Sequence, residues 1–470
     1  MSDLPEIGFG TSGLRGPAEG FRPEIVAAYV TAFLEVACKG AASNAVLIGA
    51  DLRASSPAIA AMVAAAVSAA GWEPRNAGAV PTPALAHFAL KRRMPAIMVT
   101  GSHIPPDYNG LKFYRPDGEL LKSDEKPIRD AASRYTGREG RIRSPSTPSK
   151  AVIEQYKQRY RVGFDLEGLR VGVFEHSAVG RDILAEILAG HGAECHRFGR
   201  SETFIAIDTE AVGEDHFRLM KQAISEHGLD AVVSTDGDGD RPLVLDETGS
   251  QINGDVLGAL TARALGAACV VTPLNSTGAL EKSGWFSKVL RTRIGSPYVV
   301  EAMATEAHVV GFEANGGVLV GSDSDLPSGT LGRLPTRDAM LPILAVLAAA
   351  KERAKPLSAL AAELPPRVMK ASRIKEIAPE RGNAFVADMA RSAAFRTAFY
   401  APFKEPVLID TRDGTRLSLA DGSVVHFRQS GNAPELRCYV ETDTLPATDR
   451  LLQAMMRCLI VHFEQSDRPL

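Results

Sequence analysis

Residues 230–241 read DAVVSTDGDGDR, in which an apolar run passes directly into a loop of alternating aspartates and glycines. The run DAVVST has the β-branched composition and the length of a buried strand. A strand that ends in a polar, glycine-rich loop is typical of α/β sheets, in which ligands bind beyond the carboxyl ends of the strands. The stretch therefore predicts an α/β fold with a functional site at this loop.

The same pattern occurs twice more along the chain. The strand-like run AIMVT (96–100) passes into GSHIPPDYNG, and HVVGF (308–312) passes into EANGG. Together the three copies indicate a weak internal repeat of three similar domains. Three such loops could converge on one site, whereas the simpler interpretation is three ordinary turns between elements.

Short β-branched runs alternate with alanine-rich helical stretches through most of the chain, and this alternation predicts α/β layers. The expected helices cover residues 22–39, 57–70, 84–92, 180–189, 214–226, 254–265 and 297–305. The expected strands cover residues 45–50, 96–100, 170–175, 230–235, 269–273, 288–292 and 308–312.

The last hundred residues follow a different pattern. Short strands are expected over residues 406–411, 415–420, 423–429 and 436–442, followed by a helix over residues 447–464. Asp-Gly pairs at 413–414 and 421–422 separate three of these strands, and Asp-Gly between alternating runs indicates a β-hairpin. This part is predicted to form an α+β domain.

Three segments are expected to link the domains: 144–150, a break near Asn253, and 363–368 with its Pro-Pro. The fold class expected from these features is α/β: three similar mixed α/β domains plus a C-terminal α+β domain. The corresponding domain boundaries are 1–150, 151–253, 254–367 and 368–470.

The length and composition limit the class of protein. The chain has 470 residues, 45% of them hydrophobic and 23% charged, and a net charge of −3, which fits an ordinary globular protein of several domains. The near-balance of charge argues against a nucleic-acid or anionic-membrane partner. Residues 55–72 carry no charge, but they are rich in Ala and Ser and fit a buried helix better than a membrane span.

The cysteines and the start of the chain indicate a cytoplasmic location. The five cysteines are scattered and form no CxxC pair, so we expect neither a disulfide framework nor a structural zinc site. The opening sequence MSDLPEIGFG lacks the basic and apolar regions of a signal peptide.

Asp236, Asp238 and Asp240 form the first group of candidate functional residues. Carboxylates at alternate positions of one loop can turn toward a single point and bind a divalent cation such as Mg²⁺. An EF-hand is disfavoured because Arg241 stands at the sixth loop position, where that motif needs Gly. A surface acidic loop without a metal is the remaining alternative. Arg241 favours a metal site that also meets a phosphate.

Ser102 and His103 form the second group, in the loop that continues to Lys112. A hydrolase triad fits poorly because the chain has no GxSxG elbow, and a lone Ser-His pair is often only a local hydrogen bond. A serine hydroxyl close to a divalent metal and a lysine can instead carry a phosphoryl group, since that chemistry depends on positioning and charge neutralisation.

Two further loops are candidates for binding an anion. RQSGNAPELR (428–437) offers arginines, a hydroxyl and glycine backbone amides, which together suit a phosphate. A polar hairpin loop with solvated arginines is the alternative. FGTSGLRG (9–16) is glycine-rich but lacks the nucleotide P-loop pattern, and its one cation, Arg15, is a candidate anion contact.

In this order, the motifs resemble the α-D-phosphohexomutase family of phosphoglucomutases and phosphomannomutases over essentially the whole chain. The five matching segments are FGTSGLRG (9–16), GSHIPPDYNGLK (101–112), DGDGDR (236–241), GFEANGG (311–317) and RQSGNAPELR (428–437). They are similar, respectively, to the family's N-terminal signature, phosphoserine loop, metal loop, sugar-binding loop and phosphate-binding loop.

The resemblance implies four domains around a central cleft and a Mg²⁺-dependent isomerase, with a hexose 1,6-bisphosphate as activator. A phosphoryl group would pass from Ser102 to a hexose phosphate, and the bisphosphate would return its other phosphate to Ser102. The metal would be held by Ser102, Asp236, Asp238 and Asp240. The moving phosphoryl group would be surrounded by Arg15, Lys112 and Arg241. The sugar would be read by Glu313 and Asn315, and the distal phosphate by Arg428, Ser430, Gly431, Asn432 and Arg437.

The sequence departs from the family pattern at several positions. Asn315 replaces the usual Ser of the sugar loop, Gly317 stands where some members carry His, and the phosphate loop reads GNAP rather than GTEP. The segment 175–184 also lacks the usual glycine-rich turn. The general acid/base therefore stays open, and Lys112 and His103 are both candidates to move the hydroxyl proton.

Three functions follow from these features. The leading one is a hexose-phosphate mutase: a phosphomannomutase first, with phosphoglucomutase and phosphoglucosamine mutase as alternatives. A phosphatase with Asp236 as nucleophile and a non-catalytic sugar-phosphate binding protein are the others. We expect a monomer or homodimer.

Overall fold

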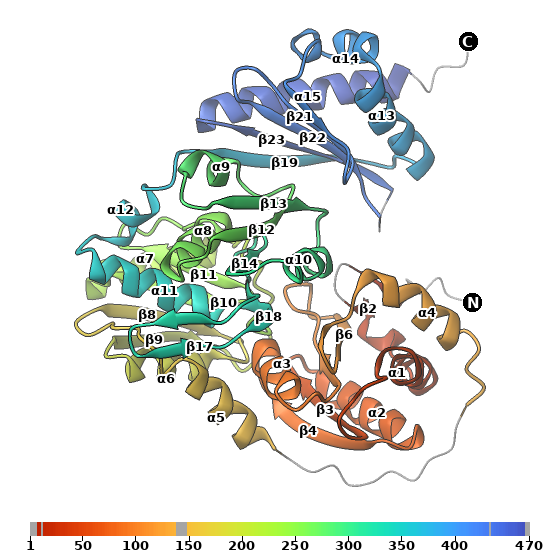
Figure 1. The fold of residues 1–470 in the computed structure, drawn as a ribbon, viewed down its shortest axis with the longest axis vertical. Coiled ribbons are helices and arrows are strands. Elements are labelled where there is room, and N and C mark those ends of the chain that lie inside the picture. The colour runs from red at the N-terminus through yellow and green to blue at the C-terminus, as the bar shows by residue number, and fades with distance from the viewer. Residues whose placement is uncertain (1–6, 11–12, 138–147, 432–433, 466–470) are drawn as a thin grey trace. The chain divides into compact units, whose positions relative to one another are not determined.

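The structure is a computed structural model and describes residues 7–10, 13–137, 148–431 and 434–465. The chain divides into two compact units, coloured along the sequence in Figure 1. The first unit consists of Met1–Val271 and Gly295–Glu363, and the second of Thr272–Ile294 and Leu364–Leu470. The second unit is therefore discontinuous in sequence.

The first unit begins with a mixed sheet in the strand order β1-β2-β6-β5-β3-β4. β3, β4 and β5 run parallel, whereas β6 runs antiparallel to β5. The elements of this part are β1 (Gly8–Phe9), β2 (Leu14–Pro17), α1 (Pro23–Ala37), β3 (Ala45–Ala50), α2 (Ser56–Ala69), β4 (Glu73–Ala79), α3 (Thr82–Leu90), β5 (Ala96–Val99), β6 (Tyr108–Arg115), β7 (Gly118–Glu119) and α4 (Lys122–Ala132).

Helices cover both faces of this first sheet because side chains alternate along β3. Val46 and Ile48 lie in one core with Phe33 of α1 and Val63 of α2. On the other face, a Cβ at Gly49 would lie 3.0 Å from Leu85 of α3, so α3 approaches the sheet closely there. Figure 1 shows α1 and α2 on one side of β3 and α3 on the other.

The second sheet of the first unit has the order β11-β10-β8-β9, with β8, β9 and β10 parallel and β11 antiparallel to β10. Its elements are α5 (Ser149–Arg159), β8 (Arg170–His176), α6 (Arg181–Gly190), β9 (Glu194–Arg200), α7 (Glu214–His227), β10 (Ala231–Thr235) and β11 (Pro242–Asp246).

The third sheet repeats this arrangement. β12 and β14 are parallel, and β14 then pairs antiparallel with β15, which pairs with β18. The elements are α8 (Gly254–Ala264), β12 (Cys269–Pro273), α10 (Ser296–Met303), β14 (Val309–Phe312), β15 (Val318–Val320), β16 (Ser324–Leu326), β17 (Gly329–Leu331), β18 (Leu334–Asp338), α11 (Met340–Glu352) and α12 (Leu357–Ala361).

The same strand–loop–strand arrangement therefore recurs in all three sheets. β5, β10 and β14 are each buried, and each leads through a loop into an antiparallel return strand. The three loops are those that the sequence singled out, so the predicted repeat is present. The return strands fix both ends of each loop, which places its polar side chains on a rigid support.

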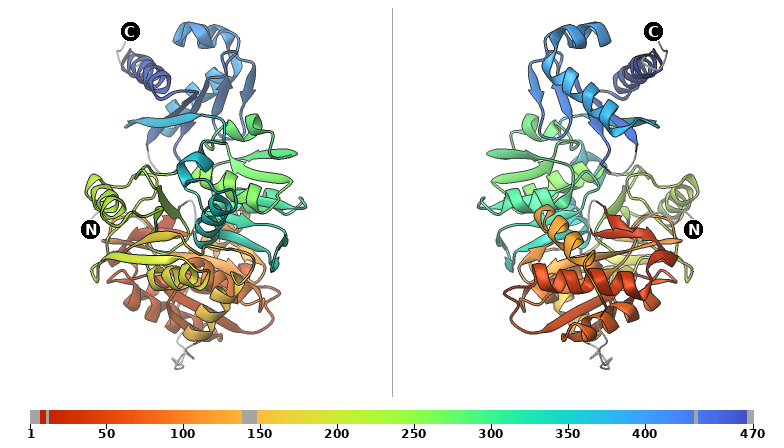
Figure 2. Two further views of the ribbon diagram at one scale, coloured as in Figure 1. Left: turned by 90° about the vertical axis from the view of Figure 1, so that its left-hand side faces the viewer. Right: turned by 90° about the vertical axis from the view of Figure 1, so that its right-hand side faces the viewer.

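The second unit is an antiparallel sheet in the order β19-β23-β22-β21-β20, with α13 and α15 packed on one face (Figure 2). Phe385 of α13 and Phe463 of α15 meet in this core. The elements are α9 (Ala279–Ser283), β13 (Lys288–Thr292), β19 (Val368–Lys375), α13 (Pro379–Arg391), α14 (Ala393–Phe399), β20 (Leu408–Asp410), β21 (Thr415–Ser418), β22 (Val424–Gln429), β23 (Glu435–Thr442) and α15 (Leu445–Gln465).

The segment 272–294 joins the second unit through a buried carboxylate. Glu441 of β23 accepts hydrogen bonds from Thr277 Oγ1 (3.0 Å) and from the Gly278 amide (2.7 Å). Arg367 also donates to Glu441 (3.1 Å), so the charge is compensated. The two separate chain segments are thus held together by groups that would be costly to leave unpaired.

The predicted helices and strands are present, with ends within two residues of those expected. Gly414 and Gly422 have φ of +82° and +81° in the predicted hairpin turns. The structure corrects the expectation for residues 149–150, which belong to α5 rather than to a linker. Residues 144–147 of that expected linker lie outside the described part.

Candidate active site

The aspartate loop between β10 and β11 is organised by Asp236. Its Oδ1 accepts hydrogen bonds from the amides of Gly239 (3.1 Å), Asp240 (3.1 Å) and Arg241 (3.2 Å). Gly239 has φ +77°, which a glycine adopts without steric penalty. The loop between the antiparallel strands β10 and β11 turns three carboxylates toward one point, as the sequence predicts.

The three carboxylates fit a divalent cation. Asp236, Asp238 and Asp240 are at most 1% exposed, and one oxygen of each lies within 4.8 Å of the others. Among the described residues, Asp238 Oδ1 and Asp240 Oδ1 are buried and have no hydrogen-bond partner. A buried carboxylate oxygen without a partner is costly, and a hard cation is its natural ligand.

The serine loop meets the aspartate loop at the Ser102 hydroxyl. Ser102 Oγ donates a hydrogen bond to Asp236 Oδ2 (2.6 Å), and the Ser102 amide donates to Thr100 Oγ1 (2.8 Å). Ser102 has φ +53°, in the left-handed region that favours glycine. A non-glycine residue keeps this backbone only when its surroundings impose it, and such strain is concentrated at functional sites.

Arg53, which was missed from sequence, imposes this backbone. Its guanidinium donates to the carbonyls of Ser102 (2.9 Å), Ile104 (2.6 Å), Pro105 (2.5 Å) and Tyr108 (3.0 Å). Only 1% of Arg53 is exposed.

A carboxylate and an aromatic ring hold Arg53 in turn. Asp51 Oδ2 accepts from Arg53 Nε (3.2 Å), and the Phe204 ring lies 4.2 Å from the guanidinium carbon. Asp51 and Arg53 follow β3 directly, so the rule that drew attention to the other post-strand loops would also have found them.

Two cations neutralise the aspartates. Lys112 Nζ lies 2.6 Å from both Asp238 Oδ2 and Asp240 Oδ2. Arg337, also missed from sequence, lies 2.8 Å from Asp240 Oδ2 and 2.7 Å from Glu313 Oε2. Because Lys112 follows the serine loop and Glu313 follows β14, charged contacts join all three predicted loops.

Further arginines lie close together beside these contacts. Burial, together with the neighbouring charges of Arg241 and Arg337, lowers the pKa of Arg15 to about 10. Like charges brought together in this way are stabilised by an anion. The arrangement thus suits a metal ion and a phosphate side by side.

Proton positions distinguish Lys112 from His103. Burial opposes the charge of Lys112, but Asp238 and Asp240 raise its pKa, so it is an ammonium ion. Burial, with Arg241 and Arg15, lowers the pKa of His103 to about 2. His103 is therefore neutral, and its Nδ1 lies 3.4 Å from Ser102 Oγ.

The sugar loop follows β14. Asn315 Oδ1 accepts from the Gly317 amide (3.0 Å), and both Glu313 and Asn315 are buried. Asn315 therefore shapes its own loop in this state.

The remaining predicted residues belong to the second unit. Arg428 lies 2.8 Å from Asp413, and Arg437 lies 2.8 Å from Glu435. The Ser430 amide donates to the Glu435 carbonyl (2.9 Å), which closes the loop that contains Gly431. Asn432 lies outside the described residues.

The sequence and the fold have clear counterparts among known proteins. Residues 6–139, 153–249 and 253–368 match the phosphoglucomutase/phosphomannomutase alpha/beta/alpha domains I, II and III, respectively. A phosphomannomutase of Sinorhizobium fredii is 42% identical over 94% of this chain and 97% of its own. A phosphomannomutase of Salmonella muenchen is 39% identical over 93% and 92%.

Among solved structures, a phosphoglucomutase/phosphomannomutase family protein of Burkholderia thailandensis matches 96% of both chains with a TM-score of 0.77 and 20% identity. The fold and the sequence matches together define an intramolecular phosphotransferase, an isomerase of hexose phosphates. The chain belongs to the α-D-phosphohexomutase family. Over the described ranges, no helix has the length and apolar character needed to span a membrane.

Proposed function

We propose that this protein is a phosphomannomutase that interconverts mannose 6-phosphate and mannose 1-phosphate through a phosphorylated Ser102. The observation that carries the proposal is the 2.6 Å contact between Ser102 Oγ and the metal-loop carboxylate Asp236. This contact places a hydroxyl beside three buried carboxylates and a protonated lysine. The 42% identity to a phosphomannomutase supports mannose as the sugar.

Mg²⁺ held by Ser102, Asp236, Asp238 and Asp240 would neutralise phosphate charge during transfer. Lys112, Arg15 and Arg241 would stabilise the charge that spreads over the phosphoryl oxygens. Neutral His103 is the nearer candidate to accept the Ser102 proton, since Lys112 already carries its own.

Glu313 and Asn315 would bind sugar hydroxyls. Arg428, Ser430, Gly431, Asn432 and Arg437 would bind the distal phosphate. A hexose 1,6-bisphosphate would serve as intermediate and activator. We place the enzyme in the cytoplasm as a monomer or homodimer that acts on small phosphosugars, without a nucleic-acid partner.

The test begins with the phosphoserine. The protein is incubated with glucose 1,6-bisphosphate and Mg²⁺, and its phosphate is mapped by mass spectrometry. We expect phosphate on Ser102 and no turnover in Ser102→Ala. An unmodified Ser102, or full activity of the variant, would refute the mechanism. Assays with mannose, glucose and glucosamine 1-phosphates then rank the sugars, and a preference for glucosamine would refute the choice of mannose.

A phosphatase with Asp236 as nucleophile is disfavoured by the same geometry. Asp236 Oδ1 accepts three loop amides and Oδ2 accepts the serine hydroxyl, so neither oxygen is oriented for attack. Hydroxylamine separates the two mechanisms, because it cleaves an acyl phosphate and leaves phosphoserine intact.

A further inference from the structure

Position 317 has no room for a side chain. A Cβ on Gly317 would lie 2.7 Å from the Asp240 carbonyl oxygen and 3.0 Å from both Cγ and Cδ of Arg337. Real Cβ atoms essentially never approach another heavy atom within 3.0 Å. The space next to Gly317 is therefore filled by the Arg337 side chain, which extends from β18.

Arg337 joins two loops that come from different sheets. Its Nη1 donates to Glu313 Oε2 (2.7 Å) and its Nη2 donates to Asp240 Oδ2 (2.8 Å). The side chain is only 4% exposed, so both contacts are shielded from solvent. A guanidinium presents its donors in a rigid plane, and one group can thus fix the orientation of two carboxylates.

The contact with Glu313 leaves one carboxylate oxygen for a ligand. Oε2 is held by Arg337, and among the described residues no hydrogen bond reaches Oε1. A carboxylate held at one oxygen and open at the other is suited to accept a hydrogen bond from a hydroxyl. Fixing its direction before the ligand arrives lowers the entropy cost of binding.

We propose that Arg337 is a positioning residue that orients Glu313 toward the sugar and ties its loop to the metal-binding carboxylate Asp240. Gly317 is its structural counterpart, since any side chain there would displace it. The inference rests on the proposed function in one respect, namely that Glu313 binds the sugar.

Arg337 also neutralises part of the negative charge of Asp240, which a divalent cation at the same site would neutralise as well. Asp240 Oδ2 contacts both Lys112 and Arg337, whereas no hydrogen bond reaches Oδ1 from the part of the chain that the structure describes. Removing one of the two cations makes the carboxylate site more negative. A divalent cation should then bind more tightly, although sugar binding becomes worse. General damage to the fold would weaken both.

The decisive experiment is a double-mutant cycle. Arg337→Met and Glu313→Gln are made singly and together, and KM and kcat are measured with mannose 1-phosphate. We expect Arg337→Met to raise KM about tenfold, as for the loss of one charge-assisted hydrogen bond. In the Glu313→Gln background, the same change should alter KM by less than about twofold.

Two further readouts address folding. Mn²⁺ titration followed by electron paramagnetic resonance should show binding several-fold tighter in Arg337→Met than in the wild type. Arg337→Lys keeps the charge but lacks the planar fork, so KM should stay raised while Mn²⁺ affinity stays near the wild-type value. Arg159→Met is the matched control, because Arg159 is also buried in the first unit and donates to the Gly332 carbonyl.

The control variant Arg159→Met should lower the melting temperature and leave KM and Mn²⁺ affinity unchanged. Equal effects of Arg337→Met on KM in the two Glu313 backgrounds, or weaker Mn²⁺ binding, would overturn the inference. A wild-type protein without mutase activity would instead refute the proposed function. An active enzyme whose KM ignores Glu313→Gln would refute the assignment of Glu313, and the role of Arg337 with it.

Discussion

The serine–metal region of the first unit and the anion loop of the second unit hold their charges in opposite ways. Ser102 and the three aspartates are at most 1% exposed, and their partners come from segments far apart in sequence. In the anion loop, the Arg428 and Arg437 side chains are 20% and 38% exposed, and each pairs with a carboxylate of its own unit.

This difference separates a fixed site from an exchangeable one. Buried charges in a dry network keep their geometry because each lost contact leaves a desolvated group. Half-exposed pairs are weak and screened by salt, so their arginines can change partner when an anion arrives. We therefore expect changes in the first region to act on turnover and changes in the second to act on binding.

Removing a metal-loop carboxylate should break the fixed site most severely. Asp238→Asn removes a cation ligand and the partner of Lys112, so kcat/KM should fall by about a thousandfold or more. Steady-state assays at saturating Mg²⁺ measure the loss, and Mn²⁺ titration should show weakened binding.

Asp246→Asn is the control for this change. Asp246 is also buried, at the end of β11, and among the described residues its side chain accepts hydrogen bonds only within its own turn, from Thr248 and Ser250. Asp246→Asn should therefore lower the stability of the protein and leave kcat/KM unchanged. Comparable losses of activity in both variants would show that the aspartate loop acts through folding.

Loosening the serine loop should have the next largest effect. In Arg53→Lys the ammonium cannot reach all the carbonyls that the guanidinium holds, so Ser102 should lose its left-handed backbone. Misplacement of a reacting group by about 1 Å costs on the order of a hundredfold in rate. We expect kcat to fall by that amount and KM to stay within about twofold.

The control for Arg53→Lys is Arg396→Lys in the second unit. Arg396 is also buried and donates to the carbonyls of Met389 and Ala390. It should lower the melting temperature without changing kcat. A slow transfer of phosphate to Ser102 in Arg53→Lys, measured by rapid quench, would locate the defect at the serine; a normal transfer rate would contradict it.

A change in the exchangeable region should act on affinity. Arg428→Gln removes one half-exposed cation, so KM should rise about tenfold with little change in kcat. The KM of the wild type should itself rise with ionic strength, and this dependence should be weaker in the variant. Arg412→Gln, which removes another exposed arginine paired with Asp410, is the control. If Arg428→Gln lowers kcat and leaves KM unchanged, the expectation that the second region acts on binding is contradicted.

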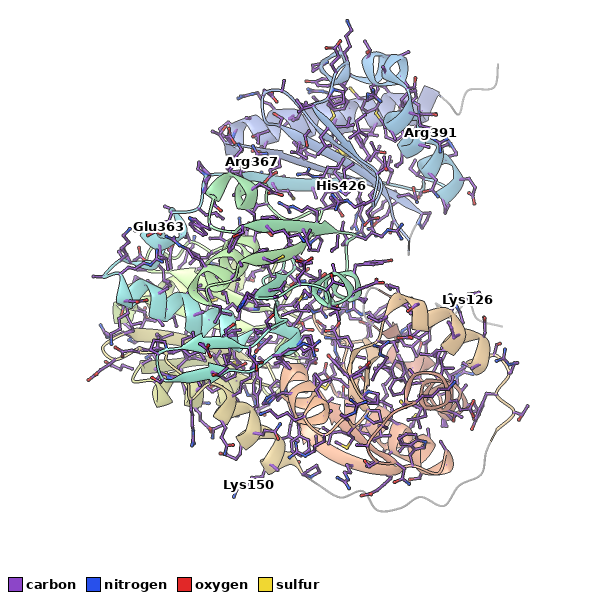
Figure 3. The ribbon with its side chains drawn as sticks, viewed as in Figure 1. Lys126, Lys150, Glu363, Arg367, Arg391 and His426 are labelled. Atoms are coloured by element: carbon purple, nitrogen blue, oxygen red, sulfur yellow. The ribbon has the colours of Figure 1, made fainter. Side chains whose placement is uncertain are left out.

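The smallest effect concerns the acid stability of the second unit. His426 is buried on β22 (Figure 3), and burial lowers its pKa to about 4 despite its hydrogen bond to the Asp413 carbonyl. Below about pH 6.5 the unfolded chain binds a proton that the folded unit does not, so stability falls as the pH drops to about 4. The loss is at most roughly 3 kcal/mol.

In His426→Gln this part of the pH dependence should disappear, with activity at pH 7.5 retained. The chain has two tryptophans, and in a Trp72→Phe background the fluorescence of Trp285 reports on the second unit. Urea unfolding at pH 7.5 and 4.5 then measures the difference. If His426→Gln loses as much stability between pH 7.5 and 4.5 as the wild type does, His426 is not the source of the pH dependence.

Sequence patterns predicted many of the buried strands and helices, but they missed the buried strand β6, the buried helix α11 and the edge strand β9. β9 (Glu194–Arg200) is an edge strand with a half-exposed, polar sequence, ECHRFGR, and therefore shows no apolar run. The loop residues were predictable for a related reason, because each follows a buried strand whose end the pattern marks.

Arg53 also follows a buried strand, β3, but its contacts and those of Arg337 were not predictable in this way. Arg53 contacts carbonyls 49 to 55 residues away, and Arg337 contacts a carboxylate 97 residues away. Backbone carbonyls carry no sequence signal, and the pairing of Arg337 with Asp240 depends on how two sheets meet. Residues that bind the ligand can thus be read from motifs, whereas residues that hold them in place depend on tertiary structure.

The discontinuous second unit has a consequence for synthesis on the ribosome. Residues 272–294 emerge before Glu441, and the 69 residues of 295–363 separate them from the rest of their unit. At 5–20 residues per second, that interval alone lasts roughly 3–14 s. During this interval the amide of Gly278 cannot bind the Glu441 carboxylate, because Glu441 has not yet been synthesised. The second unit can therefore fold completely only after its C-terminal segment has emerged.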